Sequence, residues 1–116
     1  MSLTEDILHF WFEDLDLTRE REKRQIWFKS TPEFDQAIHD NFTQAYEDAA
    51  AGRLDDMTKS QSGCLALIII LDQFSRNLFR NDAKAFAADA KAREFARYAL
   101  AQGYDQDIDQ FARTFF

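Results

Sequence analysis

The most constraining feature of the chain is an apolar run, Cys64 to Leu71, that is followed at once by polar residues. Every residue of this run is apolar, so no face of a helix or strand built from it suits water. The run therefore belongs in the interior of the fold. The polar side chains behind it are Asp72, Gln73, Arg76 and Asn77. Each costs about 1–3 kcal/mol if buried without a partner, so together they form either an internal network or the lining of a site.

The composition is typical of a helical globular protein. The 116 residues include three glycines, one proline and 46% hydrophobic residues, and no stretch alternates apolar and polar residues in the way a strand requires. We expect one domain, residues 1–116, with an all-α fold of antiparallel helical hairpins.

The net charge of −7 argues against nucleic acid and membrane surfaces as partners. A local cluster of basic residues is interrupted by Glu20 and Glu22, and consists of Arg19, Arg21, Lys23 and Arg24. Because Glu20 and Arg24 have the spacing of a favourable helix pair, we interpret the cluster as a solvated helix face, with an anion site as the alternative.

Cys64 is the single cysteine, so the chain forms no internal disulfide, and we interpret Cys64 as a small buried hydrophobe. The amino-terminal residues lack the basic and then apolar pattern of a signal peptide. No apolar run reaches the ~20 residues that a membrane-spanning helix needs. We therefore expect a cytoplasmic protein that does not enter membranes.

Several helices are predicted from capping residues and apolar spacing. Thr31, Pro32 and Glu33 form the clearest helix start, and the helix that follows is expected to stop at Gly52. A polar connection is expected over Asp55–Gly63. The other predicted helices are Thr4–Glu13 with Thr4 as cap, Arg19–Phe28, a long one from the apolar run to Phe79, Ala83–Gln102 capped by Asp82, and Gln110–Phe116 capped by Asp109.

The chain resembles the bacterial domain of unknown function 924 family. The most specific part is the segment Leu71-Asp72-Gln73-Phe74 followed by Arg76-Asn77. Further matching segments are Phe10-Trp11-Phe12, Trp27-Phe28, Phe34-Asp35, the turn at Ala50, Ala51, Gly52 and Leu54, Leu65-Ala66-Leu67-Ile68, Arg80, Ala85-Phe86 and Asp89. The resemblance implies a tetratricopeptide-like α–α superhelix and brings no established activity.

Two departures from the family pattern lead to expectations of their own. Ser75 stands where family members often have proline, so we expect the predicted helix from the apolar run to Phe79 to run straighter here. Family members typically continue beyond Phe116 into a Leu-Pro-Phe and a His-Ser-Glu stretch. We therefore expect this chain to be truncated at its carboxyl end.

The polar cluster consists of Asp72, Gln73, Arg76, Asn77 and Arg80, which form helical i,i+4 couples. One interpretation is a buried Asp72–Arg76 ion pair with a purely structural role, in which case Asp72→Ala would cost about 2–4 kcal/mol. The other is a clamp for an anion or a peptide carboxylate, with Arg76 and Arg80 supplying the forked donors.

The sequence offers weaker candidates for a metal site, a nucleophile or a binding groove. His9 with Glu13, and Asp35 with His39, have metal-binding spacing on a helix, but neither pair has a third ligand nearby, so we predict no metal site. We find no nucleophile motif and predict no cofactor. The aromatic residues Phe10, Trp11, Phe12, Trp27 and Phe28 are interpreted as core, with a binding groove as the alternative.

We hypothesise a binding module that takes a protein segment or another acidic or polar ligand beside Arg76, Asn77 and Arg80. The alternatives are an enzyme with Asp72 as base and Arg76 as anion holder, and a purely structural subunit. The chain ends in an aromatic segment that includes Phe111, Phe115 and Phe116. We expect these residues and the predicted helix Ala83–Gln102 to form a homodimer interface, or else the aromatic tail to fold back onto Trp11 or Trp27.

Overall fold

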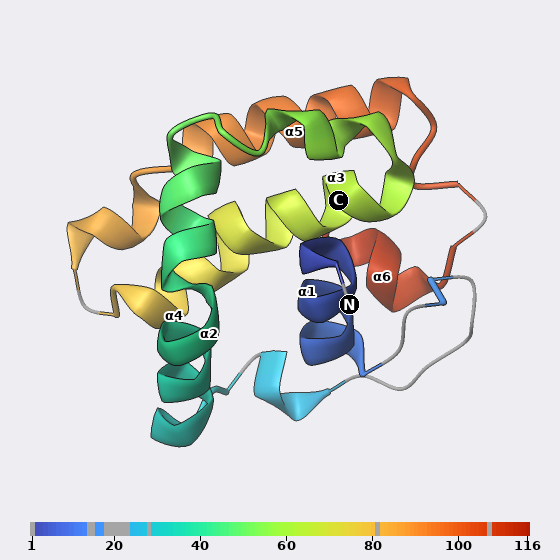
Figure 1. Cartoon of the computed structure of the whole chain (residues 1–116). Coiled ribbons are helices and arrows are strands. Elements are labelled where there is room, and N and C mark those ends of the chain that lie inside the picture. Colours follow the sequence, from blue (N-terminus) through green and yellow to red (C-terminus); the bar gives the residue numbers. More distant parts are fainter. Residues whose placement is uncertain (1, 14–15, 18–23, 28, 81, 107) are drawn as a thin grey trace.

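A computed structural model describes residues 2–13, 16–17, 24–27, 29–80, 82–106 and 108–116, with the side chains of residues 110 and 111 excepted. These residues form helices and turns and contain no strand, so the all-α prediction is confirmed (Figure 1). No helix among them is both long and apolar enough to span a bilayer. The elements are α1 Leu3–Phe12, η1 Gln25–Trp27, α2 Pro32–Ala50, η2 Asp55–Lys59, α3 Gln61–Ile68, η3 Ile69–Phe74, α4 Ser75–Leu78, η4 Ala83–Phe86, α5 Asp89–Ala101 and α6 Gln110–Thr114.

Helix α1 begins two residues earlier than Thr4 would place it, because Ser2 is the cap. The Ser2 hydroxyl accepts from the Glu5 amide, and the Glu5 carboxylate accepts from the Ser2 amide. The prediction that Thr4 is the cap is therefore wrong. The reciprocal Ser2–Glu5 pair satisfies two free backbone amides, whereas a threonine side chain alone would satisfy one. At the other end, the Trp11 carbonyl accepts from the side chains of Arg24 and Trp27 at 2.6 and 2.8 Å.

Arg24 is half-buried and pairs with Glu13 at 2.9 Å. The Arg24 guanidinium donates to the carbonyl oxygens of Phe10 and Trp11, which lack partners within α1. Arg24 therefore does not lie on a solvated helix face as we predicted. Residues 18–23, which include the other members of the basic cluster, lie outside the described residues, as does most of the helix predicted for Arg19–Phe28.

Helix α2 starts as predicted. The Thr31 side chain accepts from the Phe34 amide, Pro32 takes the first helical position, and Gly52 follows the helix with a φ of 86°. The buried stripe of α2 is the predicted apolar one and contains Ile38, Phe42, Ala45, Tyr46 and Ala49. The connection after it is more ordered than predicted, because η2 forms a short 3-10 helix and α3 already begins at Gln61.

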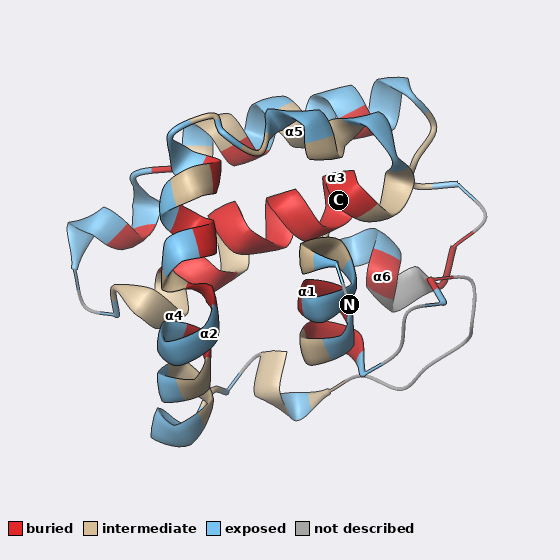
Figure 2. Ribbon diagram, in the orientation of Figure 1, coloured by how far each residue is buried: buried red, intermediate tan, exposed pale blue. Residues whose placement is uncertain are grey.

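The third long helix runs through α3, η3 and α4 and is buried over most of its length (Figure 2). Residues 63 to 71 are all buried, as the apolar run predicts. The middle segment η3 is a π-helix, which the sequence did not lead us to expect within the predicted long helix. A π-turn shifts the side chains after it relative to an α-helix, and such turns are frequent at functional sites.

The predicted helix Ala83–Gln102 is divided into η4 and α5. Asp82 caps η4 by accepting from the Lys84 amide at 3.0 Å. Helix α5 runs antiparallel to α3 and packs against it (Figure 1), and small residues such as Ala99 lie in that contact with Cys64 and Ile68. This pairing is compatible with tetratricopeptide-like hairpins, and the superhelix stays a prediction.

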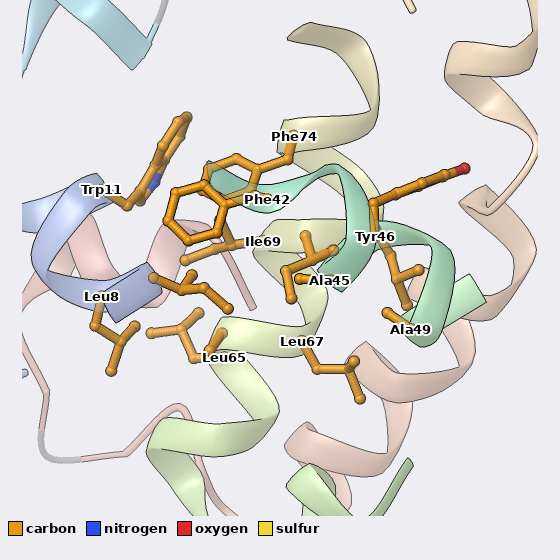
Figure 3. Packing of buried hydrophobic residues seen from close by; sticks show 14 of the residues in the cluster. Leu8, Trp11, Phe42, Ala45, Tyr46, Ala49, Leu65, Leu67, Ile69 and Phe74 are labelled. Carbon is orange, nitrogen blue, oxygen red and sulfur yellow. The ribbon is translucent and has the colours of Figure 1, made fainter. Parts of the chain in front are cut away.

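Phe74 lies at the centre of an aromatic core (Figure 3). Its side chain is fully buried, and its ring centroid lies 5.0 Å from that of Phe42, 5.8 Å from Trp11 and 5.9 Å from Phe10. Rings at these separations attract one another beyond the effect of burial alone. The core thus joins α1, α2 and the π-helix.

The aromatic tail packs back onto the core, which is the second of the two predicted outcomes. The ring of Phe115 lies 5.1 Å from Trp27, 5.4 Å from Trp11 and 5.7 Å from Phe12. Asp109 caps α6 as predicted, accepting from the Ala112 amide at 3.3 Å. Phe115 therefore packs against its own chain. This packing does not support a role of Phe115 in a dimer interface, and that role stays a prediction.

Candidate functional site

The π-turn determines how Asp72 and Arg76 meet. The Asp72 backbone carbonyl accepts from the Arg76 guanidinium and, at 3.2 Å, from the Ser75 hydroxyl. Side chains therefore supply donors to a carbonyl next to the transition from π- to α-helix. Ser75 is fully buried, which gives a physical reason for a small hydroxyl residue at this position.

Arg76 is held between two carboxylates. Its Nη1 lies 3.0 Å from Asp72 Oδ1, and its Nη2 lies 3.4 Å from Asp89 Oδ2. The second oxygen of Asp72 accepts from Gln73 Nε2 at 2.8 Å. The guanidinium also lies over the ring of Phe86, 5.1 Å from its centroid. These contacts fix the direction of the Arg76 fork.

The Asp72–Arg76 pair is half-exposed, with side chains that are 37% and 38% accessible, so a buried ion pair is wrong. The reason is that the pair lies at the end of the apolar run, where the third helix leaves the core. We expect Asp72→Ala to lower the free energy of unfolding by about 1 kcal/mol, because water screens the pair and solvates Arg76 after the loss. Urea unfolding tests this value, and a loss above ~3 kcal/mol would contradict the observed exposure.

Asp35 is the centre of a second network that the sequence spacing did not reveal. Its Oδ1 accepts from Ser30 Oγ at 2.7 Å and from Asn77 Nδ2 at 2.7 Å, while Arg80 contacts both of its oxygens at 2.8 and 3.0 Å. Burial raises the pKa of Asp35, but the hydrogen bonds from Arg80, Asn77 and Ser30 outweigh it and hold the pKa below its usual value. Asp35 thus joins the start of α2 to the end of α4.

Asp35 should make the fold sensitive to acid. A lowered pKa means that the Asp35 contribution is complete above its unfolded pKa of about 3.9 and is lost as the pH falls through the lower folded value. We expect Asp35→Asn to cost about 1–2 kcal/mol at neutral pH and progressively less as the pH falls below ~4. Urea unfolding at a series of pH values measures the difference. A cost of Asp35→Asn that is constant down to pH ~2 would contradict the stabilising role of the ionised Asp35 carboxylate.

Four of the five predicted polar residues line one small cavity of about 160 Å³. Its lining consists of Trp11, Ile26, Trp27, Ser30, Gln73, Arg76, Asn77 and Arg80. We call it the inner cavity. It lies between the end of α1, η1 and the end of the third helix. Trp11 and Trp27 therefore serve both the core and the cavity wall, the two alternatives that the aromatic pattern left open.

The Trp11 side chain has an unusual feature. Its side chain is 2% exposed, and its indole nitrogen is one of two buried polar side-chain atoms without a hydrogen-bond partner among the described residues. The other atom is Oδ1 of Asp89, whose second oxygen binds Arg76. Buried polar groups are nearly always paired, so these two atoms are exceptions among the described residues.

A second, larger hollow of about 460 Å³ adjoins the inner cavity. Arg76 and Arg80 line both, and the remaining wall consists of Asp82, Ala83, Ala85 and Phe86. Phe86 is 58% exposed, although it is a large apolar residue. We call this the outer hollow. The two arginines form the boundary between the two spaces.

Asp72 is not brought into the inner cavity with the other four residues. It lines a separate hollow of about 190 Å³, together with Arg93 from α5 and Thr114, Phe115 and Phe116 from the carboxyl end of the chain. Both Asp72 carboxylate oxygens already accept hydrogen bonds, from Arg76 and Gln73. The predicted polar cluster thus divides into residues that face the cavity and an acid that orients them.

The other candidate residues, Cys64, Asp35 and His39, have surroundings that are typical of structural residues. Burial raises the pKa of the Cys64 thiol to about 11, which disfavours the nucleophilic thiolate. Asp35 is engaged by Arg80 rather than by His39, and His39 instead lies 3.7 Å from Asp40. No group of three potential metal ligands occurs within the part of the chain that the structure describes.

Comparison with known families identifies the relatives of this chain. Residues 7–116 match the family described as bacterial protein of unknown function (DUF924). The chain belongs to the DUF924 family. The segments on which the sequence resemblance rests are far apart in the chain, yet Trp11, Trp27, Arg76, Asn77 and Arg80 line the same cavity of this DUF924 chain.

A solved structure supports the same fold. The chain is similar to a protein of unknown function from Agrobacterium tumefaciens, with 36% sequence identity and a TM-score of 0.86. The match covers 97% of this DUF924 chain and 60% of the other protein, so the chain spans less than two thirds of that relative. No curated protein matches it.

Proposed function

We propose that this DUF924 chain is a binding module whose ligand occupies the inner cavity and contacts Arg76, Asn77 and Arg80. One observation carries the proposal: polar side chains from near the end of the third helix, those of Gln73, Arg76, Asn77 and Arg80, line one cavity together with Trp11 and Trp27. A concave space with a few directed polar groups is the usual form of a ligand site.

The enzyme alternative has less support. A catalytic base needs a free carboxylate oxygen that faces the substrate, whereas both Asp72 oxygens accept from neighbouring side chains. Asp72 also lines a different hollow from Arg76 and Arg80. The alternative of a purely structural subunit does not require a cavity lined by these side chains. These contacts favour a positioning role for Asp72 and a binding role for the cavity.

A thermal-shift screen with polar small molecules and short peptides tests the proposal. We expect some compounds to raise the melting temperature of the wild-type protein and to lose that effect with Arg76→Ala. Arg53→Ala is the matched control, because Arg53 pairs with Asp48 on the exposed surface of α2 and its turn. Ligands that stabilise the Arg76→Ala protein as strongly as the wild type would reject the cavity as the site.

We further propose a homodimer and a cytoplasmic location. Support for the dimer comes from two apolar side chains of α5, Tyr98 and Leu100, which are 40% and 54% exposed. Phe111, Phe115 and Phe116 belong to the same proposal, although Phe115 packs inward. The location is supported by a single buried thiol, Cys64, with no partner for a disulfide in the sequence.

Sedimentation equilibrium at micromolar concentration tests the dimer. We expect a species of twice 13.6 kDa that dissociates with Leu100→Asp, because a charge on the exposed face of α5 disrupts an apolar contact and leaves the fold intact. Phe115→Asp is unsuitable because it also removes core packing. A wild-type protein that sediments as a 13.6 kDa monomer would exclude the dimer.

A further inference from the structure

The side-chain amides of Gln73 and Asn77 use their nitrogen atoms within the protein. Gln73 Nε2 donates to Asp72 Oδ2 at 2.8 Å, and Asn77 Nδ2 donates to Asp35 Oδ1 at 2.7 Å and to Ser30 Oγ at 3.2 Å. An ionised carboxylate only accepts hydrogen bonds, so these contacts fix which end of each amide is nitrogen. The carbonyl oxygens, Gln73 Oε1 and Asn77 Oδ1, accept from no group among the described residues.

Both amide oxygens are accessible to a ligand. The buried side-chain atoms that lack a partner within the described part of the chain are Trp11 Nε1 and Asp89 Oδ1, and neither amide oxygen is one of them. Gln73 and Asn77 line the inner cavity, whereas the acids that hold their nitrogen atoms do not. Each amide therefore turns its nitrogen to an acid outside the lining, and its oxygen is the acceptor that it offers to the cavity.

The two arginines of the lining each keep a donor as well. Arg76 binds Asp72 through Nη1 and Asp89 through Nη2, which leaves its Nε–H without a partner in the described ranges. Arg80 binds Asp35 through Nε and Nη2, which leaves Nη1 in the same state. The inner cavity therefore offers hydrogen-bond donors beside the two amide acceptors.

The charges of this region favour a neutral ligand. Arg76 and Arg80 are paired with the three carboxylates of Asp35, Asp72 and Asp89. An anion gains little from guanidinium groups that these acids already neutralise. A cation would enter a cavity whose lining contains both guanidinium groups and none of the three acids. An uncharged group that both donates and accepts hydrogen bonds fits these walls better than either ion.

The size and the apolar walls of the inner cavity restrict the rest of the ligand. Its volume of about 160 Å³ equals the share of about five water molecules, at ~30 Å³ each in the liquid. The indole rings of Trp11 and Trp27 and the side chain of Ile26 supply apolar surface. A small ring or a short aliphatic group suits this space.

We infer that the inner cavity takes a small neutral carboxamide, whose N–H groups donate to Gln73 Oε1 and Asn77 Oδ1 and whose carbonyl oxygen accepts from Arg76 Nε. The inference rests on the proposed function and names the ligand class of the same site. The carboxamide is either that of a small molecule or a backbone amide of a peptide. In the second case the peptide continues into the outer hollow beside Phe86.

Four probes with one ring and different head groups test the ligand class: benzamide, methyl benzoate, benzoate and benzylammonium. Trp11 and Trp27 are the two tryptophans of the chain and both line the cavity, so tryptophan fluorescence reports its occupancy. We expect benzamide to bind about tenfold more tightly than methyl benzoate, which accepts hydrogen bonds but donates none. Benzoate and benzylammonium should also bind more weakly than benzamide, because each carries a charge that the site does not match.

Gln73→Met keeps the length of the side chain and removes the acceptor. We expect it to reduce benzamide affinity about tenfold and to leave methyl benzoate affinity unchanged, since methyl benzoate has no N–H for Gln73. A purely structural role of Gln73 would weaken both probes alike. Gln44→Met is the matched control, because Gln44 Nε2 donates to Asp48 Oδ1 at 3.1 Å on the exposed part of α2. If Gln73→Met does not fold, the order of the four probes on the wild-type protein decides alone.

A tripeptide with a central phenylalanine, acetylated and amidated at its ends, distinguishes the two sources of the amide. Tighter binding of this peptide than of benzamide identifies a peptide ligand, and weaker binding identifies a small carboxamide.

Two results would overturn the inference: methyl benzoate or either ion that binds as tightly as benzamide, and a Gln73→Met protein that is folded and binds benzamide as the wild type does. Neither would reject the binding module, because a ligand of another class can still stabilise the wild type and depend on Arg76 in the thermal-shift screen. Failure of that screen with all ligands, including benzamide, would remove the proposed function and this inference together.

Discussion

Phe74→Ala is expected to lower the free energy of unfolding by about 3–5 kcal/mol, the loss typical of a large aromatic residue removed from a packed core. The side chain is fully buried and contacts rings from α1 and α2, so its removal leaves a space that three elements border. Since domains of this size are stable by only about 5–15 kcal/mol, a large part of the stability would disappear.

Urea unfolding followed by far-ultraviolet dichroism measures the effect. Glu47→Ala is the control: it shortens a side chain that is exposed on α2, and we expect a change within ~0.5 kcal/mol. A Phe74→Ala protein that loses less than ~1 kcal/mol would mean that the aromatic cluster is not the centre of the core.

Gly63→Ala is expected to lower the free energy of unfolding by about 2–3 kcal/mol, through overpacking. A methyl group at this position would overlap the Met57 carbonyl oxygen and would lie 2.8 Å from the Ser60 hydroxyl, which caps α3. The carbonyl belongs to the backbone of η2 and cannot move without disturbing that turn. In an open helix the same change stabilises by about 1 kcal/mol, so the sign of the effect is informative.

Urea unfolding of Gly63→Ala and Ser62→Ala separates crowding from helix propensity. Ser62 is the preceding residue of α3 and is only partly buried. We expect its substitution to change stability by less than ~0.5 kcal/mol. If Gly63→Ala stabilised the protein, the close approach of η2 to the start of α3 would be excluded.

The parts of the fold that depend on local sequence were predicted well. Thr31 and Pro32 start α2 where the capping rules place them, and the apolar run from Cys64 to Leu71 is buried throughout. The π-turn was not predicted because hydrophobic periodicity cannot reveal a change in hydrogen-bond spacing inside a segment that is apolar on every side. The capping role of Ser2 was missed although the sequence contains its signal, since Ser2 and Glu5 have the spacing of a capping box.

The candidate site was predicted only in part, because its contacts join residues far apart in the chain. Gln73, Arg76, Asn77 and Arg80 line one cavity, and their common position near the end of the third helix was visible in the sequence. Asp35 binds Asn77 across 42 positions, so no local spacing could pair them. The half-exposed state of Asp72 was also hidden, since it depends on where the third helix emerges from the core.

The most direct measurement is a crystal structure of the protein with the strongest ligand from the thermal-shift screen. We predict that the ligand lies in the inner cavity, with an acceptor atom within hydrogen-bond distance of the Arg76 guanidinium, and with the Asp35–Arg80 and Asp72–Arg76 pairs intact. A ligand bound on the outer face of α5, or in the hollow beside Arg93 and Phe116 with the inner cavity empty, would contradict the assignment of the site.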